Sequence, residues 1–142
     1  MCFNGHKNWI LGWYNNAKIT VNPKTNGAWV GNLVTFVDYP LASQVANSVV
    51  LINVGDLYIQ LNSAKKFNIQ TMAQANKVTI VQANSIRPFS YMLAGLGAGQ
   101  SYTYANFNGT GVALTIQICN IRFGTVDYAK ITLYLANQKS RC

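Results

Sequence analysis

The chain has 142 residues, half of them hydrophobic, and its 11 Lys and Arg residues face three acids and one His, for a net charge of +8. The acids are Asp38, Asp56 and Asp127, and the chain contains no Glu. Glycosidases need two carboxylates at one bond, and HExxH zinc peptidases need two His and a Glu. A zinc site with three His ligands requires more than His6. The chain by itself is therefore excluded from these enzyme classes.

The length fits one domain, and 50% hydrophobic content beside 10% charged residues argues against disorder. The net charge raises the question of nucleic acid as a partner, but the basic residues are scattered and only Lys65 and Lys66 are adjacent. We rank nucleic-acid binding last. The positive charges are interpreted either as solvated surface charges or as groups that attract the chain to an anionic matrix. No apolar run is long enough for a membrane-spanning helix, and the first residues lack a signal-peptide pattern.

A short helix is predicted over residues 4–14, where Asn4 is a candidate N-cap and Gly12 lies near the end. Beyond Tyr14 the apolar residues alternate with a period of two, and β-branched and aromatic residues dominate. The candidate strands are residues 17–21, 29–37, 48–54, 57–61, 77–82, 89–93, 101–106, 112–119 and 128–135. Because no long crossover helices separate them, we predict a mainly β fold. The predicted architecture is an antiparallel β-sandwich, either jelly-roll or Ig-like (immunoglobulin-like), with a short N-terminal helix.

Turn residues separate the candidate strands at 22–27, 55–56, 95–99 and 108–109. Gly55-Asp56 between two β-rich runs predicts a hairpin. Asp38 and Asp56 are interpreted as turn residues, because neither belongs to a calcium-binding cluster. Residues 63–76 predict a long loop with a helical turn at 72–76.

Two cysteines predict a disulfide bridge. Cys119 ends a candidate strand and Cys142 is the last residue, so a bridge would tie the C-terminal tail to the sheet in an oxidising compartment. Closing a loop of about 24 residues would stabilise the fold by about 3 kcal/mol; the alternative is two unrelated thiols.

Cys2 and His6 have the spacing of half a metal site on a helix, but a second ligand pair is missing. His6 is therefore assigned to the surface or to a helix cap.

Two features are typical of extracellular, carbohydrate-binding domains. Asn108 begins a glycosylation sequon in a predicted turn, although such a triplet also fits an ordinary tight turn. Exposed aromatic rings can stack on sugars, and the candidates are Trp29, near a strand start, and Tyr102 and Tyr104 on one strand face. The alternative is that these rings belong to the core.

Three segments carry a family resemblance. They are residues 1–14 (MCFNGHKNWILGWY), residues 56–68 (DLYIQLNSAKKFN) continued by 75–81 (ANKVTIV), and residues 96–103 (LGAGQSYT) with 106–109 (NFNG). In order and spacing they resemble the gametolysin family of secreted zinc metallopeptidases, in particular its diatom and algal versions. The resemblance covers nearly the whole chain.

The resemblance implies a parent enzyme that cleaves extracellular-matrix or cell-wall glycoproteins. In that family an HExxHxxGxxH helix binds zinc through three His, and its Glu is the general base. None of these residues has a counterpart here, so no catalytic residue is carried over and zinc is expected only in a missing catalytic part. Residues 1–16 would be the last helix of the catalytic domain, and residues 17–142 a C-terminal β-sandwich domain. Met1 would be an internal methionine.

Two hypotheses about function follow. As the non-catalytic part of such a peptidase, the chain is expected to contact the upstream catalytic domain through Trp9, Trp13 and Tyr14. The alternative is a free-standing extracellular β-domain that binds polysaccharide or an acidic cell-wall polymer. Both hypotheses place the chain outside the cell, and neither requires a cofactor bound to this chain.

Overall fold

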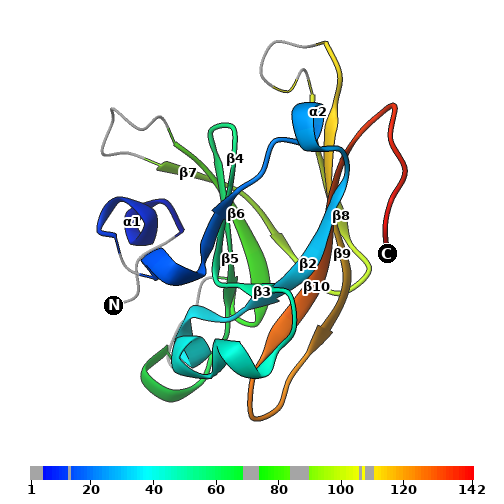
Figure 1. Cartoon of the computed structure of the whole chain (residues 1–142). Coiled ribbons are helices and arrows are strands. Elements are labelled where there is room, and N and C mark those ends of the chain that lie inside the picture. The colour runs from blue at the N-terminus through cyan, green and yellow to red at the C-terminus, as the bar shows by residue number, and fades with distance from the viewer. Residues whose placement is uncertain (1–4, 13, 69–73, 84–89, 106, 108–110) are drawn as a thin grey trace.

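The computed structural model describes residues 5–12, 14–68, 74–83, 90–105, 107 and 111–142. Two five-stranded sheets pack face to face as a β-sandwich (Figure 1). Sheet A has the order β1 (Lys18–Thr20), β4 (Leu51–Val54), β5 (Leu57–Asn62), β6 (Lys77–Ala83) and β7 (Ser90–Leu96). Sheet B has the order β3 (Ser48–Val49), β2 (Trp29–Val34), β10 (Tyr128–Leu135), β9 (Leu114–Arg122) and β8 (Ser101–Tyr104). The predicted mainly β sandwich is confirmed.

Most neighbouring strands are antiparallel, but each sheet has one parallel pair at its edge. These pairs are β1 with β4 and β3 with β2, so the sheets are mixed rather than wholly antiparallel. The hairpin predicted at Gly55-Asp56 is confirmed, because β4 and β5 pair with Val54 opposite Leu57. Gly55 has φ +60°, a backbone conformation that glycine adopts without the steric cost of a Cβ.

The main core fills the space between the two sheets. Alternate residues of sheet A, such as Leu57 and Ile59, meet alternate residues of sheet B, such as Ile116 and Ile131, and all four are fully buried. This is the expected result of period-2 patterning when one strand face meets the partner sheet. Strand β5 is buried along its whole length, because helix α1 (Gly5–Ile10) packs on its other face.

The predicted strand 29–37 ends early, at Val34. The chain then forms a 3-10 segment, η2 (Phe36–Gln44), in which the Thr35 hydroxyl accepts a hydrogen bond from the Val37 amide at 3.4 Å. Pro40 lies inside this segment and has no N–H to donate to a sheet ladder. The apolar residues at 36–37 therefore continue the strand pattern in the sequence, but in the structure they are buried in a 3-10 segment.

Other boundaries differ by a few residues. Helix α1 is shorter than the predicted helix, and the candidate strand 48–54 is two strands interrupted at Val50. Strand β7 runs through Gly95 to Leu96, so the turn predicted at 95–99 starts later, with the Gln100 amide donating to the Gly97 carbonyl. The turn predicted at 22–27 contains helix α2 (Pro23–Asn26), capped by Asn22. Within the loop predicted over 63–76, residues 66–68 form the 3-10 turn η3 (Lys66–Asn68). Residues 72 and 73 of the predicted helical turn lie outside the described residues.

Candidate functional site

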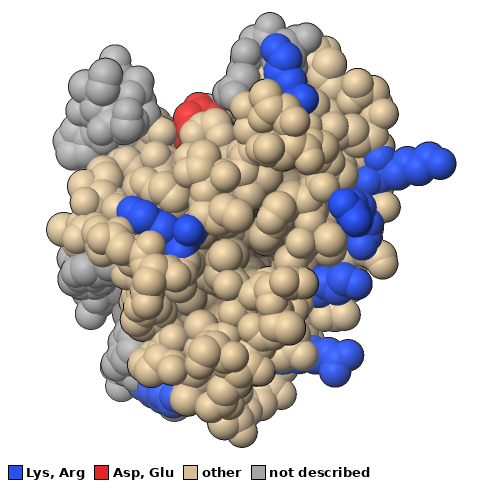
Figure 2. Space-filling view, in the orientation of Figure 1, with Lys and Arg blue, Asp and Glu red and all other residues tan. Residues whose placement is uncertain are grey.

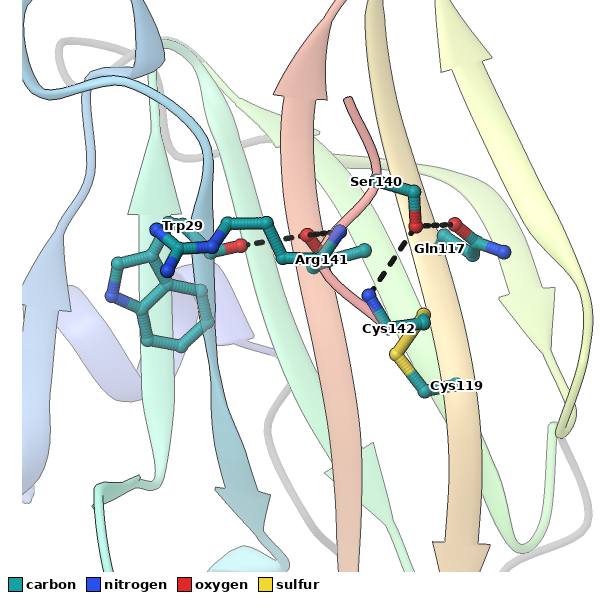
Figure 3. The surroundings of a disulfide bond; sticks show 7 residues. Trp29, Gln117, Cys119, Ser140, Arg141 and Cys142 are labelled. Atoms are coloured by element: carbon teal, nitrogen blue, oxygen red, sulfur yellow. Dashed lines mark hydrogen bonds between the residues drawn. A yellow bond between two sulfur atoms is a disulfide. The ribbon is translucent and has the colours of Figure 1, made fainter. Parts of the chain in front are cut away.

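The C-terminal tail, residues 136–142, is fixed to the outer face of sheet B (Figure 3). Cys142 forms a disulfide with Cys119 of β9, with 5.5 Å between their Cα atoms, so the predicted bridge is confirmed. The Ser140 hydroxyl donates to Gln117 Oε1 at 2.6 Å. A covalent bond and a hydrogen bond therefore hold the last residues against one strand.

The tail places Arg141 beside Trp29. The Arg141 amide donates to Thr132 Oγ1 at 3.4 Å, and the Thr132 hydroxyl donates to the Trp29 carbonyl at 2.9 Å. Arg141 Nη1 donates to the Ala28 carbonyl at 3.4 Å, and in Figure 3 the Arg141 side chain extends from the tail toward Trp29. An exposed cation and an aromatic ring are thus brought to the same edge of sheet B.

Trp29 and Arg141 line an open groove of about 460 Å³. The rest of its lining comes from edge strands of both sheets and their connections: Ile19, Ala28, Val30, Asn47, Ser48 and Val49. Trp29 is half-buried, and its ring lies over Gly31, where a Cβ atom would come within 2.6 Å of two ring atoms. Glycine at this position therefore makes room for the indole. The Trp29 ring, which was predicted to be exposed, packs partly against the main core and forms one wall of the groove.

The other two predicted aromatic residues lie elsewhere. Tyr102 and Tyr104 belong to β8, at the opposite edge of sheet B from the groove, and both are half-buried against the main core. Gln82 Nε2 donates to the Tyr104 hydroxyl at 3.0 Å and to Asp56 Oδ2 at 2.8 Å. Burial raises the pKa of Tyr104, and the negative charge of Asp56 raises it further. The three predicted rings do not form one platform.

Helix α1 is fixed to the outer face of sheet A. His6 is fully buried, with its ring centroid 5.0 Å from that of Tyr58, and Asn8 Nδ2 donates to Gln60 Oε1 at 2.8 Å. Tyr58 and Gln60 alternate with the inward-facing residues of β5, so their side chains reach the helix. The assignment of His6 to the surface is therefore wrong, because sheet A presents a second buried face to this helix.

The aromatic residues expected to contact an upstream domain contact the sandwich itself. The ring centroid of Trp9 lies 5.8 Å from that of Tyr58, and Lys18 Nζ is 4.3 Å from the Trp9 ring. Tyr14 packs edge-on against Tyr39, with 4.8 Å between centroids.

Trp13 and Cys2, which also figured in the sequence predictions, lie outside the described residues. The exposed apolar side chains of the helix and the turn after it are Ile10 and Leu11, at 51% and 50% exposure.

A buried ionic network joins three distant segments. Asp38 is fully buried in η2 and accepts hydrogen bonds from Lys65 Nζ at 2.7 Å and Lys66 Nζ at 2.8 Å. Lys65 also pairs with Asp127 at 3.3 Å, and the Asp127 amide donates to Asp38 Oδ2 at 3.0 Å. Asp38 and Asp56 both lie in turns, as predicted, since the Asp38 amide donates to the Thr35 carbonyl at 3.0 Å. The sequence did not indicate that Asp38 is also buried in an ionic network.

The network shifts the pKa of Asp38 and that of Lys65. Burial by itself would raise the pKa of Asp38, but the hydrogen bonds from Lys65 and Lys66 prevail and hold the pKa of this carboxyl below its usual value. Burial would likewise lower the pKa of Lys65, yet its bonds to Asp38 and Asp127 raise that pKa. Two of the three acids are therefore paired with lysine side chains within the fold.

Positive charge gathers on sheet B. Its five strands and the tail contain no acidic residue and carry Arg122, Lys130, Lys139 and Arg141. Figure 2 shows Lys and Arg along the side of the molecule that sheet B forms in Figure 1. Sequence reasoning missed Arg141 as a site residue, although its position next to Cys142 was the available signal.

Within the described ranges, no three His, Cys, Asp or Glu residues gather as a metal site. No helix among those residues is long and apolar enough to cross a membrane. The predicted glycosylation site, Asn108, lies outside the described residues. Comparison with protein-family models, with curated proteins and with solved structures found no match.

Proposed function

We propose that the chain is the C-terminal, non-catalytic portion of a gametolysin-like, secreted zinc metallopeptidase that degrades extracellular-matrix or cell-wall glycoproteins. The proposal starts from the sequence resemblance. The segment 1–14 is similar to the one that follows the active site in that family, and the later segments keep the same order. The chain then serves as a β-sandwich domain attached to a catalytic part that precedes Met1.

One observation about helix α1 supports this role. Its inner face is fixed to sheet A through buried His6 and Asn8, while Ile10 and Leu11 at its end are half-exposed. Apolar side chains at the end of an anchored helix are suited to contact with a further domain. In this proposal Ile10 and Leu11 make that contact, rather than Trp9 and Tyr14, whose rings are engaged within the sandwich.

The described residues of this chain do not fit a zinc site. His6 packs against Tyr58, and Cys119 and Cys142 are joined to each other. Zinc ligands must be deprotonated and converge on one point, so the metal of the proposed enzyme has to be held by residues outside this part of the chain. The disulfide supports the secreted location, because such bonds persist in oxidising compartments.

The transcript that encodes the chain tests the proposal. We expect an open reading frame that continues upstream of Met1 and encodes HExxHxxGxxH within the preceding segment. An in-frame stop codon directly upstream of Met1 would refute the proposal.

A further inference from the structure

The exposed and half-exposed basic residues near sheet B come from β10, the tail and α2. The tail contributes Lys139 and Arg141, which are exposed, and β10 contributes half-exposed Lys130. The Gln138 side chain donates to the Pro23 carbonyl at 2.8 Å, which brings exposed Lys24 of α2 next to the tail. We define these four cations, Lys24, Lys130, Lys139 and Arg141, as the basic face.

The spacing of the basic face follows from the strand geometry. The Arg141 amide bonds to Thr132, and Lys130 lies two residues along the same side of β10. Two residues of a strand span about 7 Å. Arg122 pairs with Tyr128, two residues further along, so a fifth cation extends the row toward the β9–β10 turn. The residues that carry the positive charges therefore form a row along the sheet, from which the Arg141 guanidinium reaches across to the Ala28 carbonyl.

No acidic side chain lies in this row. Asp38 and Asp127 are buried and bonded to Lys65 and Lys66, and Asp56 lies on the β4–β5 turn of sheet A. The remaining side chains on the outer face of sheet B are mostly uncharged and polar, including Thr103, Thr115, Gln117 and Asn32. Hydroxyl and amide groups beside spaced cations match a ligand that carries both hydroxyls and regularly spaced anions.

The groove at the end of the row fits a sugar ring. Trp29, whose ring also packs against the main core, offers an apolar aromatic wall, and Asn47 and Ser48 add polar groups to the lining. Arg141 belongs both to the groove and to the basic face, because the disulfide to Cys119 fixes the tail that carries it. A polymer lying along the basic face can place one ring in the groove, where aromatic contact and hydrogen bonds are available.

We propose that the outer face of sheet B, together with the groove at its β2–β3 edge, is a binding surface for an acidic polysaccharide, one that carries sulfate or carboxylate groups. The basic face binds the anionic groups and the Trp29–Arg141 groove holds one ring. The basic face lies on the opposite sheet from helix α1, and the groove lies where edge strands of the two sheets meet, so the surface does not depend on the metallopeptidase assignment. A polysaccharide is favoured over nucleic acid because hydroxyl and amide side chains and a groove accompany the cations. A platform for stacking successive bases needs several exposed rings, and Phe123, next to Arg122, offers a single one at one end of the row.

The test is binding of the purified full chain to a sulfated galactan, with alginate, an uncharged β-glucan and duplex DNA as further probes. We expect binding to the sulfated galactan or to alginate that weakens as salt rises from 25 to 300 mM, because screening shortens the reach of each charge. No binding to the uncharged glucan is expected. Failure to bind either acidic polysaccharide at low salt, or tighter binding to DNA than to both, would overturn the proposal.

Two matched double variants separate a specific surface from net charge. Lys130→Ala with Arg141→Ala removes two cations from sheet B, and Lys18→Ala with Lys77→Ala removes two from sheet A. Both pairs lower the net charge from +8 to +6. The first pair is expected to weaken binding by about tenfold and the second by less than about threefold. Equal weakening by the two pairs would overturn the proposal.

The groove is tested separately with Asn47→Gly. Asn47 is exposed on the groove wall and has φ +50°, so glycine removes the side chain without straining the backbone. We expect binding of the acidic polysaccharide to weaken by about threefold with an unchanged thermal unfolding midpoint. Unchanged affinity would exclude the groove as the place where a ring is held.

Discussion

Asp38→Asn is the substitution that tests the buried ionic network most directly. Asparagine has nearly the same shape as aspartate but lacks the charge that holds Lys65 and Lys66. Removing one partner of a buried ion pair typically costs about 3–5 kcal/mol, because the other charge stays buried. Here the side chains of Lys65 and Lys66 are 21% and 52% exposed, so water can solvate part of their charge. We therefore expect a loss of about 2–3 kcal/mol in the free energy of unfolding.

Urea unfolding followed by far-UV circular dichroism measures this loss. With a slope near 2 kcal/mol per molar urea, the midpoint is expected to fall by about 1–1.5 M. Asp56→Asn is the matched control, since Asp56 is half-exposed in a turn and accepts a bond from Gln82. It is expected to change stability by less than about 0.5 kcal/mol. If Asp38→Asn destabilises the protein no more than this control does, the network contributes nothing and the reasoning fails.

Three other predictions concern the same fold. First, the stability that Asp38 contributes is present above its unfolded-state pKa of about 3.8 and is lost as pH falls through its lower pKa in the folded state. Between pH 2 and 4 the wild type should therefore lose stability more steeply than Asp38→Asn. Parallel plots of unfolding free energy against pH for the two proteins would contradict this. Second, Cys119→Ser with Cys142→Ser opens a loop closed over 23 positions of separation, for an expected loss of about 3 kcal/mol by urea unfolding; an unchanged midpoint would argue against the bridge. Third, Gly31→Ala brings a methyl group against the Trp29 ring, at an expected cost of about 1–3 kcal/mol with altered tryptophan fluorescence; an unchanged spectrum and stability would mean that the ring does not lie over this glycine.

The strands were predictable because their physics is local. Period-2 alternation in segments such as 57–61 and 112–119 reports one buried face, and both segments form strands near those bounds. The Gly55-Asp56 turn was predictable for the same reason, since two adjacent residues determine a tight hairpin. The disulfide followed from the positions of Cys119 at the end of a candidate strand and Cys142 at the end of the chain.

The errors arose where distant segments decide the outcome. His6 is buried because strand β5, more than 50 residues later, presents Tyr58 to it. Asp38 is buried in a network with Lys65 and Asp127, which lie 27 and 89 residues away along the chain. No local pattern contains such pairings.

The aromatic residues of the candidate site show the same limit. Alternation predicts that Tyr102 and Tyr104 share a face, and they do, but it does not say which face meets the core. The packing of Trp29 depends on Gly31 and on the tail that carries Arg141. The groove therefore became visible only when strands from both sheets and the last residues were placed together.

Peptidase activity tests most directly whether the chain belongs to a gametolysin-like enzyme. The measurement compares the native protein, purified with an antibody against the sandwich, with the isolated chain of 142 residues. We expect the native protein to be larger and to degrade extracellular glycoprotein in a reaction that a chelator stops and zinc restores. The isolated chain is expected to be inactive with or without zinc. Chelator-sensitive proteolysis by the pure isolated chain, or a native protein of the same size without activity, would contradict the proposed function.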